Sequence, residues 1–489
     1  MKNYGLKKMR KTVKIFYDKI LSRPVIKNFS ILSIANILAQ ASFLLASIRL
    51  APLLGPAGYG YYNIIIVLAS IFAIISTFGM RTIIIRSIAR SPNHTRSYFL
   101  KTVTLRSFFL VCSFLVFILY NTVVDKDMKD TFSIIAVMIL VTTTTLWDTV
   151  ESVSFGNQIM KISAFIELAA AIVWTGSIYI VPDNLFDVKL ILVIHIGIQI
   201  IKNAAYLSWL LASNVLKKKQ PLDIPADSLN IIVKYSSSYF LLAVFTCMQN
   251  LFPLIFLERN TNLAQVGIFN VGYRILAPLQ MLITVALTAL FPNMSVLSFK
   301  NPTSFYEKCK KGIFFVMLTG ITGCLLFTIF SEEIVLLLYG ESFKQSARVI
   351  SLQCWYVIFY GIFSFIGTVW SASNMQKRLA VISGIGTCIA LPVLWIGSKY
   401  GSEGLALSFI ISSMINMSYH WYLFASKTFV QRISLKESMT YWTIFIIYMI
   451  ISISIPQELN VWYKLGIMLF ILSPIFFYLY GKRKIYSQI

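Results

Sequence analysis

Residues 61–80 read YYNIIIVLASIFAIISTFGM, a stretch without a single charged side chain. An α-helix rises about 1.5 Å per residue, so a stretch of this length crosses the roughly 30 Å hydrocarbon core of a bilayer. Within that core, only a helix or a closed barrel satisfies all of its own backbone hydrogen bonds. This stretch therefore predicts a transmembrane helix.

Apolar runs of similar length recur along the chain and define the fold class. Turn-forming residues separate them, among them Gly55-Pro56, Pro182-Asp183-Asn184 and Asn301-Pro302. We expect an all-α integral membrane protein with about 14 transmembrane helices, and at least about 12. The span at 132–153 has the weakest signal. The predicted spans are 29–52, 61–80, 98–120, 132–153, 162–181, 188–212, 231–256, 268–291, 312–330, 347–371, 379–398, 405–425, 439–455 and 465–480.

The composition excludes a soluble fold. Hydrophobic residues make up 57% of the chain and charged residues 13%, whereas soluble domains carry about 25% charged residues. The six cysteines form no CxxC pair, and we expect no disulfide framework, metal site or cofactor. The basic first 28 residues precede a helix-length apolar run without a small-residue cleavage site, so we expect no cleavable signal peptide.

The loops differ in charge, and this predicts the orientation. If the basic N-terminus is cytoplasmic, the loops on its side hold cations such as 217–219 and Lys377, and the opposite loops hold acids such as Glu332 and Glu403. The positive-inside rule then places both termini in the cytoplasm. The net charge of +24 is spread over many short loops that face anionic lipid, so we expect no nucleic-acid partner.

Short strings that recur about 210–217 residues apart indicate an internal duplication. Gly58-Tyr59-Gly60 is similar to Val266-Gly267-Ile268, and Gly156-Asn157-Gln158 is similar to Ser373-Asn374-Met375. Six spans lie between equivalent strings, so the halves would share one orientation and enclose a site near the bilayer midplane. The alternative is chance similarity. The predicted regions are a basic cytoplasmic N-terminus at 1–28, an N-lobe of six spans at 29–212, a cytoplasmic linker at 213–230, a C-lobe of six spans at 231–425, and two further spans with a basic C-terminus at 426–489.

Several longer motifs follow one another in chain order over most of residues 30–425. They are APLLGPAGYGYY (51–62), GMR (79–81), IAR (88–90), VGIFNVGYR (266–274), ALFP (289–292), LYGESF (338–343) and GSEGLA (401–406). Together they resemble the polysaccharide transporter family, the O-antigen and capsule repeat-unit flippases of the multidrug/oligosaccharidyl-lipid/polysaccharide exporter superfamily.

This resemblance implies a fold, a cargo and a location. It implies two lobes of six helices, transport by alternating access, and an undecaprenyl-diphosphate-linked oligosaccharide as the substrate. The protein would lie in the bacterial cytoplasmic membrane and serve the synthesis of O-antigen, capsule or exopolysaccharide. Its partners would be the lipid-linked oligosaccharide and membrane lipid, with a polysaccharide polymerase and a chain-length regulator as possible further partners.

Arg274 is the leading candidate for a substrate-binding residue. It falls in the early part of the eighth span, where a charged side chain is costly unless it has a function. Pro278 removes the amide that would bond to the Arg274 carbonyl, so we expect a local helix break beside the cation. Arginine can bind a diphosphate with two parallel hydrogen bonds. The alternative is that Arg274 snorkels to the outer interface.

Other polar residues within the spans are further candidates. The additional candidates for substrate binding are Arg49, Arg81, Lys234, Asn36, Gln40, Asn250 and Asn270, of which Asn36 and Gln40 share a helix face. Candidates for binding a coupling ion are Glu167, His195 and His420. The alternative for each amide, histidine and carboxylate is a hydrogen bond that joins neighbouring helices.

Three other functions compete with the repeat-unit flippase. A multidrug cation exporter needs acids in its first span, which has none, and a lipid II flippase would be expected to carry charge inside that span. A polysaccharide polymerase or glycosyltransferase would need a sizeable outer loop or an acidic pair near the membrane surface. The only tight outer pair is Glu332-Glu333, and the chain has no GxxxxGK[ST] string, so we expect neither enzymatic activity nor catalytic residues.

Overall fold

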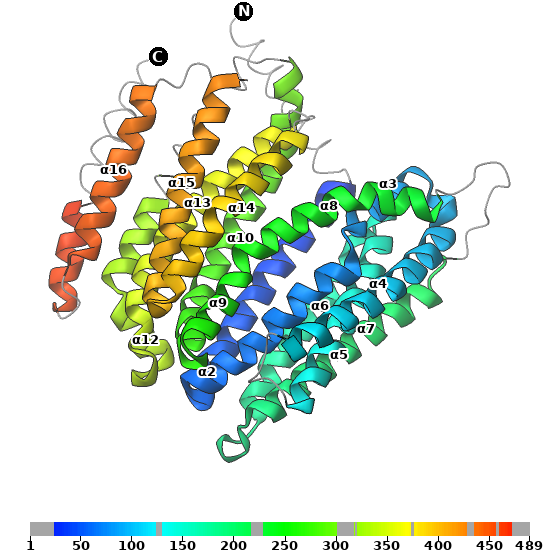
Figure 1. Cartoon of the computed structure of the whole chain (residues 1–489), viewed down its shortest axis with the longest axis horizontal. Coiled ribbons are helices and arrows are strands. Elements are labelled where there is room, and N and C mark those ends of the chain that lie inside the picture. The colour runs from blue at the N-terminus through cyan, green and yellow to red at the C-terminus, as the bar shows by residue number, and fades with distance from the viewer. Residues whose placement is uncertain are drawn as a thin grey trace, which may run out of the picture. The chain divides into compact units, whose positions relative to one another are not determined.

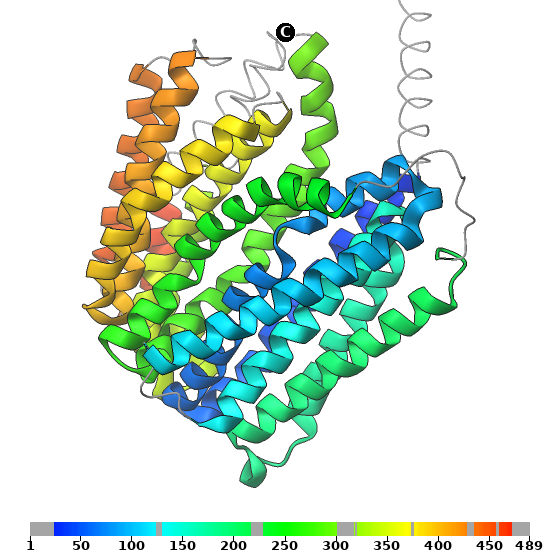
Figure 2. The same ribbon diagram turned by 45° about the vertical axis from the view of Figure 1, so that its right-hand side comes forward.

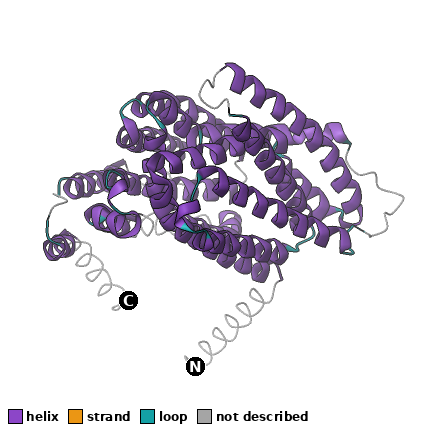
Figure 3. Ribbon diagram, turned by 90° about the horizontal axis from the view of Figure 1, so that it is seen from below, coloured by secondary structure: helices purple, strands orange, loops and turns teal. Residues whose placement is uncertain are grey.

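A computed structural model describes residues 24–123, 130–216, 228–300, 317, 320–372, 376–427, 435–455 and 459–471. Throughout these ranges the regular structure is helical, and no strand occurs in them (Figure 3). The sequence therefore predicts the fold class correctly. Several predicted features lie outside the described residues: most of the N-terminal segment, the lysines at 217–219, much of the span at 312–330 and the chain beyond residue 471.

The first two predicted spans form one kinked element, α2 (Pro24–Thr77), of 54 residues. A straight helix of that length would be about 80 Å long, far more than one bilayer crossing requires. The kink lies at Gly55, whose φ of 66° and ψ of 172° are not helical. Glycine tolerates this positive φ because it has no Cβ. The predicted turn at Gly55-Pro56 is thus a bend of a single residue.

Two compact units make up the chain, and their bounds differ from those of the predicted lobes. The first comprises 1–46 and 65–244, and the second comprises 47–64 and 245–489. Residues 47–64 of α2 therefore belong with the C-terminal helices, and most of α8 (Leu229–Asn250) belongs with the N-terminal ones. The predicted lobes at 29–212 and 231–425 stay a prediction.

The first unit is a helix bundle in which α5 is central. Its helix α5 (Thr131–Gly156) packs against several helices of this unit, and α4 to α7 lie side by side (Figures 1 and 2). The helix α5 confirms the weak predicted span at 132–153. The neighbours of α5 include α3 (Met80–Arg90), α4 (Thr95–Val123), α6 (Met160–Ile180) and α7 (Val188–Ala212), and the end of α2 joins it through a hydrogen bond between the Ser76 and Thr145 hydroxyls.

The second unit is organised around α13 (Ser346–Ala372), which supplies much of its apolar core. Trp355 of α13 is completely buried, and its indole N–H donates to the Thr328 hydroxyl at 3.0 Å. This unit also contains α9 (Phe252–Asn260), α10 (Leu263–Lys300), α12 (Ser331–Tyr339), α14 (Gln376–Ser398), α15 (Gly401–Lys427), α16 (Leu435–Ile453) and a shorter helix at Val461–Ile471.

Length and composition make this a multi-pass membrane protein. Nine helices of the described residues are long and apolar enough to cross a membrane, with the kinked α2 counted once. A tenth span arises if Gly320–Ile329 and α12, which meet at a bend of 67°, form one crossing. Each of the predicted spans coincides with a helix where the structure describes it.

Within the second unit, α2 and α10 cross with backbone against backbone. A Cβ added to Gly60 would lie 1.8 Å from the Leu263 carbonyl oxygen, and one added to Gly267 would lie 2.1 Å from the Pro56 carbonyl oxygen. Gly60 and Gly267 are 207 residues apart in the chain, as are Pro56 and Leu263. The contact is therefore reciprocal, as a parallel internal repeat predicts.

Candidate functional site

Arg274 lies on α10 among tyrosines of the second unit. Its charge interacts with Tyr59 and Tyr62 of α2 and with Tyr273, its neighbour in the chain. Tyr59 and Tyr62 are almost fully buried, and their stacked rings lie 6.5 Å apart between centroids. Arg274 itself is half-buried. Within the described part of the chain, no carboxylate forms an ion pair with Arg274.

The tyrosines beside Arg274 are held by further contacts within the second unit. The Tyr59 ring meets the Phe343 ring edge-on at 6.2 Å between centroids, and Phe343 packs against Tyr339. The Tyr339 hydroxyl shares a hydrogen bond of 2.8 Å with the Ser47 hydroxyl. The LYGESF motif, which includes Tyr339 and Phe343, thus lies against the GYGYY motif, and the two motifs together position the tyrosines around Arg274.

The predicted helix break beside Arg274 does not occur. The helix α10 continues from Leu263 to Lys300 through Pro278. The missing amide of Pro278 still leaves the Arg274 carbonyl without its usual helical partner. Neighbouring helices often compensate for a single proline inside a transmembrane helix, and α10 packs closely against α13.

Arg81 lies in a cluster of charges in the first unit. It pairs with Asp148 at 2.7 Å and with Glu151 at 2.5 Å, both on α5, and its guanidinium lies over the Phe155 ring. Asp148 also pairs with Arg106 of α4, whose side chain is only 2% exposed. The two arginines and two carboxylates balance in charge. The predicted substrate residue Arg81 is therefore already paired inside the protein.

Glu167, one of the candidates for a coupling residue, is paired as well. Its carboxylate accepts a hydrogen bond of 3.0 Å from Lys202 of α7, whose ammonium lies 4.2 Å from the centre of the Trp147 ring. The Lys202 side chain is 8% exposed and that of Glu167 is 29% exposed. A proton that neutralised Glu167 would leave the lysine charge without its counter-charge, so the two groups form one electrostatic unit.

The remaining candidates have varied surroundings. Asn270 is buried and donates to the Val266 carbonyl, and Asn250 is exposed and donates to the Thr246 carbonyl, so both amides bond to their own helix. His195 lies 3.2 Å from the Gln199 amide and contacts the Trp174 ring edge-on. The Lys234 side chain is exposed, those of Asn36, Gln40 and Arg49 are half-buried, and that of His420, on α15, is not among the described residues.

Sequence reasoning missed two features of these sites. Arg106 lies inside a predicted span and met the same criterion that selected Arg274, an ionisable group within a span. Lys464 is completely buried and pairs with Glu333 at 2.6 Å. It precedes the predicted last span by one residue, so its position in the sequence indicates a loop cation and not a buried one.

The described residues define a polytopic membrane protein: they form many apolar helices, with an arginine within one span and a balanced charge cluster near the end of another. A family model described as polysaccharide biosynthesis protein matches residues 25–298, and one described as lipid II flippase MurJ matches residues 190–476. The chain belongs to the polysaccharide biosynthesis protein family. Its overlap with the MurJ model extends over much of the C-terminal half.

Two curated proteins are similar over most of their length. The probable low-salt glycan biosynthesis flippase Agl15 of Haloferax volcanii is 22% identical over 82% of this chain and 83% of its own. The capsular polysaccharide biosynthesis protein CapF of Staphylococcus aureus is 22% identical over 82% of this chain and 99% of its own. Their names support a flippase-like role in polysaccharide biosynthesis at the level of the family.

Solved structures show the same fold. The lipid II flippase MurJ in an inward closed conformation matches with a TM-score of 0.67 and 14% identity, over 91% of this chain and 98% of that one. An inward-facing multidrug resistance transporter of the MATE family matches with a TM-score of 0.62 and 10% identity, over 81% and 96% of the chains. These proteins are transporters, and this chain shares their helical architecture.

Proposed function

We propose that this protein is a flippase for undecaprenyl-diphosphate-linked oligosaccharide repeat units. It would act by alternating access in the bacterial cytoplasmic membrane, with both termini in the cytoplasm, and would supply the synthesis of O-antigen, capsule or exopolysaccharide. A polysaccharide polymerase and a chain-length regulator would act on the translocated product. The family and the names of the relatives support the flippase class, and Arg274 supports the diphosphate.

The observation that carries this proposal is the environment of Arg274. A cation within a span is costly, and its partner is usually another charge or the ligand. Arg81 and Arg106 of the first unit satisfy this rule by pairing with Asp148. Arg274 has tyrosine rings around it and, among the described residues, no carboxylate partner. A diphosphate would provide the negative charge, and the guanidinium fork matches its oxygens.

A second candidate is a lipid II flippase. The specific support for it is the match of the MurJ model to residues 190–476, together with the fold shared with MurJ. Both substrates carry a polyprenyl diphosphate, so Arg274 suits either. Complementation distinguishes the two: a lipid II flippase would sustain growth of cells depleted of their own, whereas a repeat-unit flippase would restore only the surface polysaccharide.

The test compares Arg274→Ala and Arg274→Lys in the producing strain. We expect alanine to block export of surface polysaccharide at normal membrane levels of the protein, and lysine to restore it only in part because the two-pronged contact is lost. The matched control is Arg348→Ala, which removes an arginine of the same unit that is 73% exposed and paired with Glu403, and which should export normally.

The readout is surface polysaccharide per unit of membrane protein. Normal export from Arg274→Ala would contradict the proposed diphosphate site. Full rescue by lysine, with alanine lowering only the amount of protein, would identify Arg274 as a snorkelling anchor.

A further inference from the structure

The helix α10 has a polar face next to Arg274. Tyr273, Ala277, Gln280 and Thr284 recur at intervals of three and four residues, so they lie along one side of the helix. We call them the α10 stripe. From Tyr273 to Thr284 the stripe is about 16 Å long at 1.5 Å per residue, enough for a few sugar units. It lies beside the arginine and not across the helix from it.

The exposed residues of α10 differ between its two sides. Tyr273, on the stripe, is 51% exposed. Leu282, which is 50% exposed, follows Tyr273 by nine residues. Nine residues make two and a half helical turns, so Leu282 lies on the opposite side of α10. Leucine is the residue expected to face lipid. A half-exposed tyrosine followed by an amide and a hydroxyl on the same side is expected where a span lines a polar path.

Several polar groups of the stripe have unused hydrogen-bonding capacity. No described residue forms a hydrogen bond with the Tyr273 hydroxyl or with the Gln280 side-chain amide. The Thr284 hydroxyl, by contrast, donates to the Gln280 carbonyl at 3.0 Å and shares a hydrogen bond of 3.0 Å with the Tyr360 hydroxyl of α13. The Thr284 end of the stripe is thus held by hydrogen bonds, whereas Tyr273 and Gln280, which are nearer to Arg274, keep donors and acceptors for a ligand.

The packing partner α13 adds two more tyrosines. Tyr356 and Tyr360, one turn apart, both interact with Tyr273, and the Tyr356 ring lies edge-on to Phe409 of α15 at 5.2 Å. The helices α10 and α13 lie against each other in the second unit (Figures 1 and 2). Tyrosine presents an apolar ring and a polar hydroxyl together. This combination suits a pyranose, which has an apolar C–H face and hydroxyls around its edge.

We propose that the α10 stripe, with Tyr356 and Tyr360, binds the sugar residues of the lipid-linked oligosaccharide while Arg274 holds its diphosphate. This inference rests on the proposed function. A sugar ring would stack on Tyr273, and its hydroxyls would bond to the Gln280 amide and the tyrosine hydroxyls. The arginine would then recognise the part common to all such lipids, and the stripe would recognise the part that differs between them.

The experiment measures the binding of two lipids to the purified protein in detergent. One is farnesyl diphosphate, which has the charge and no sugar, and the other is the lipid-linked oligosaccharide extracted from the producing strain. We expect Tyr273→Ala and Gln280→Ala to weaken binding of the oligosaccharide lipid at least tenfold and to leave binding of farnesyl diphosphate unchanged. Tyr273→Phe, which keeps the ring, should lose less than Tyr273→Ala.

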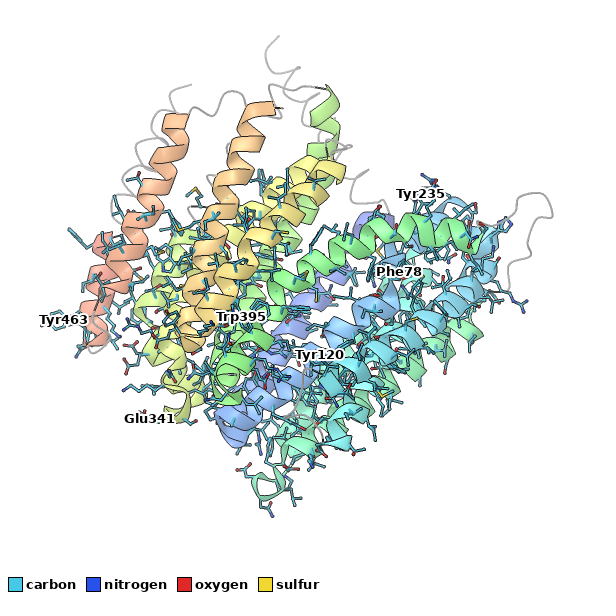
Figure 4. The ribbon with its side chains drawn as sticks, viewed as in Figure 1. Phe78, Tyr120, Tyr235, Glu341, Trp395 and Tyr463 are labelled. Carbon is cyan, nitrogen blue, oxygen red and sulfur yellow. The ribbon has the colours of Figure 1, made fainter. Side chains whose placement is uncertain are left out.

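Two further variants separate this inference from the proposed function. Arg274→Ala should weaken binding of both lipids. Tyr463→Ala is the matched control, which should bind both lipids normally, since Tyr463 is 71% exposed on the helix Val461–Ile471 of the same unit (Figure 4). If Arg274→Ala binds both lipids normally, the diphosphate site is refuted, independently of the result for the stripe.

The stripe itself is refuted by either of two results. Unchanged binding of the oligosaccharide lipid by Tyr273→Ala and Gln280→Ala would leave it as a water-lined surface without a role in sugar recognition. If these variants instead weaken the binding of both lipids equally, the substitutions act on diphosphate binding or on folding. That result would also overturn sugar binding by the stripe.

Discussion

Replacing Asp148 by asparagine should destabilise the first unit strongly. Asp148 accepts from Arg81 at 2.7 Å and pairs with Arg106, which is only 2% exposed. The variant would leave Arg81 paired with Glu151, but Arg106 would keep only neutral partners such as the Thr149 hydroxyl, 2.8 Å away, and would lose its counter-charge. Removing one partner of a buried ion pair costs about 3–5 kcal/mol, because the other charge stays buried without compensation. We expect a loss of stability of about that size.

The assay is thermal unfolding of the purified protein in detergent, together with its abundance in the membrane. The matched control is Asp130→Asn. Asp130 is an exposed carboxylate that directly precedes α5, at the end of the helix opposite to Asp148. This variant should not shift the unfolding transition measurably, since exposed ion pairs contribute little. The double variant Arg106→Met/Asp148→Leu should be more stable than Asp148→Asn, because it removes the buried charge along with its partner.

The reasoning fails if Asp148→Asn unfolds at the same temperature as the unmodified protein. It also fails if the double variant is no more stable than Asp148→Asn, because the destabilisation would then not come from the unpaired charge of Arg106.

Two further predictions concern single contacts. Gly60→Ala and Gly267→Ala should each lower the unfolding temperature, since the new Cβ would lie 1.8 Å or 2.1 Å from a carbonyl oxygen. The control Gly323→Ala should not lower it, because a Cβ there meets nothing within 4 Å. Equal unfolding temperatures for all three variants would contradict the close crossing of α2 and α10. Glu167→Gln should abolish pH-driven export at normal protein levels if Glu167 carries the coupling proton. If it only neutralises Lys202, 3.0 Å away, the same variant should lower abundance, and adding Lys202→Met should restore both abundance and export.

The helices of this protein were predictable from the sequence because a bilayer leaves an apolar run of about 20 residues almost no other structure. Even the weakest run, at 132–153, forms the central helix α5. Bends were less predictable. Gly55-Pro56 indicated a loop and is a kink of one residue, whereas Pro278 indicated a break and lies within a continuous helix. Both outcomes depend on packing that no local pattern records.

The charged contacts could be predicted only in part. The rule that ionisable groups within spans have a function selects Arg274 and Glu167, and it applies equally to Arg106. It does not say which groups pair. Asp148 is separated by 42 residues from Arg106 and by 67 from Arg81, and Glu167 by 35 from Lys202. Such pairs form only when separate helices pack, so the sequence shows the charges but not their partners.

The crossing of α2 and α10 bears on how such a chain could have arisen. Gly60 faces Leu263 and Gly267 faces Pro56, with the same separation in the chain for both equivalent pairs. This is the geometry of an isologous interface, in which one surface patch meets a second copy of itself. A half-length ancestor bearing a single glycine at this position would have formed both contacts at once by pairing as a homodimer. After a gene fusion, the two glycines would have become separate positions that can mutate independently, although each would still serve the other's half.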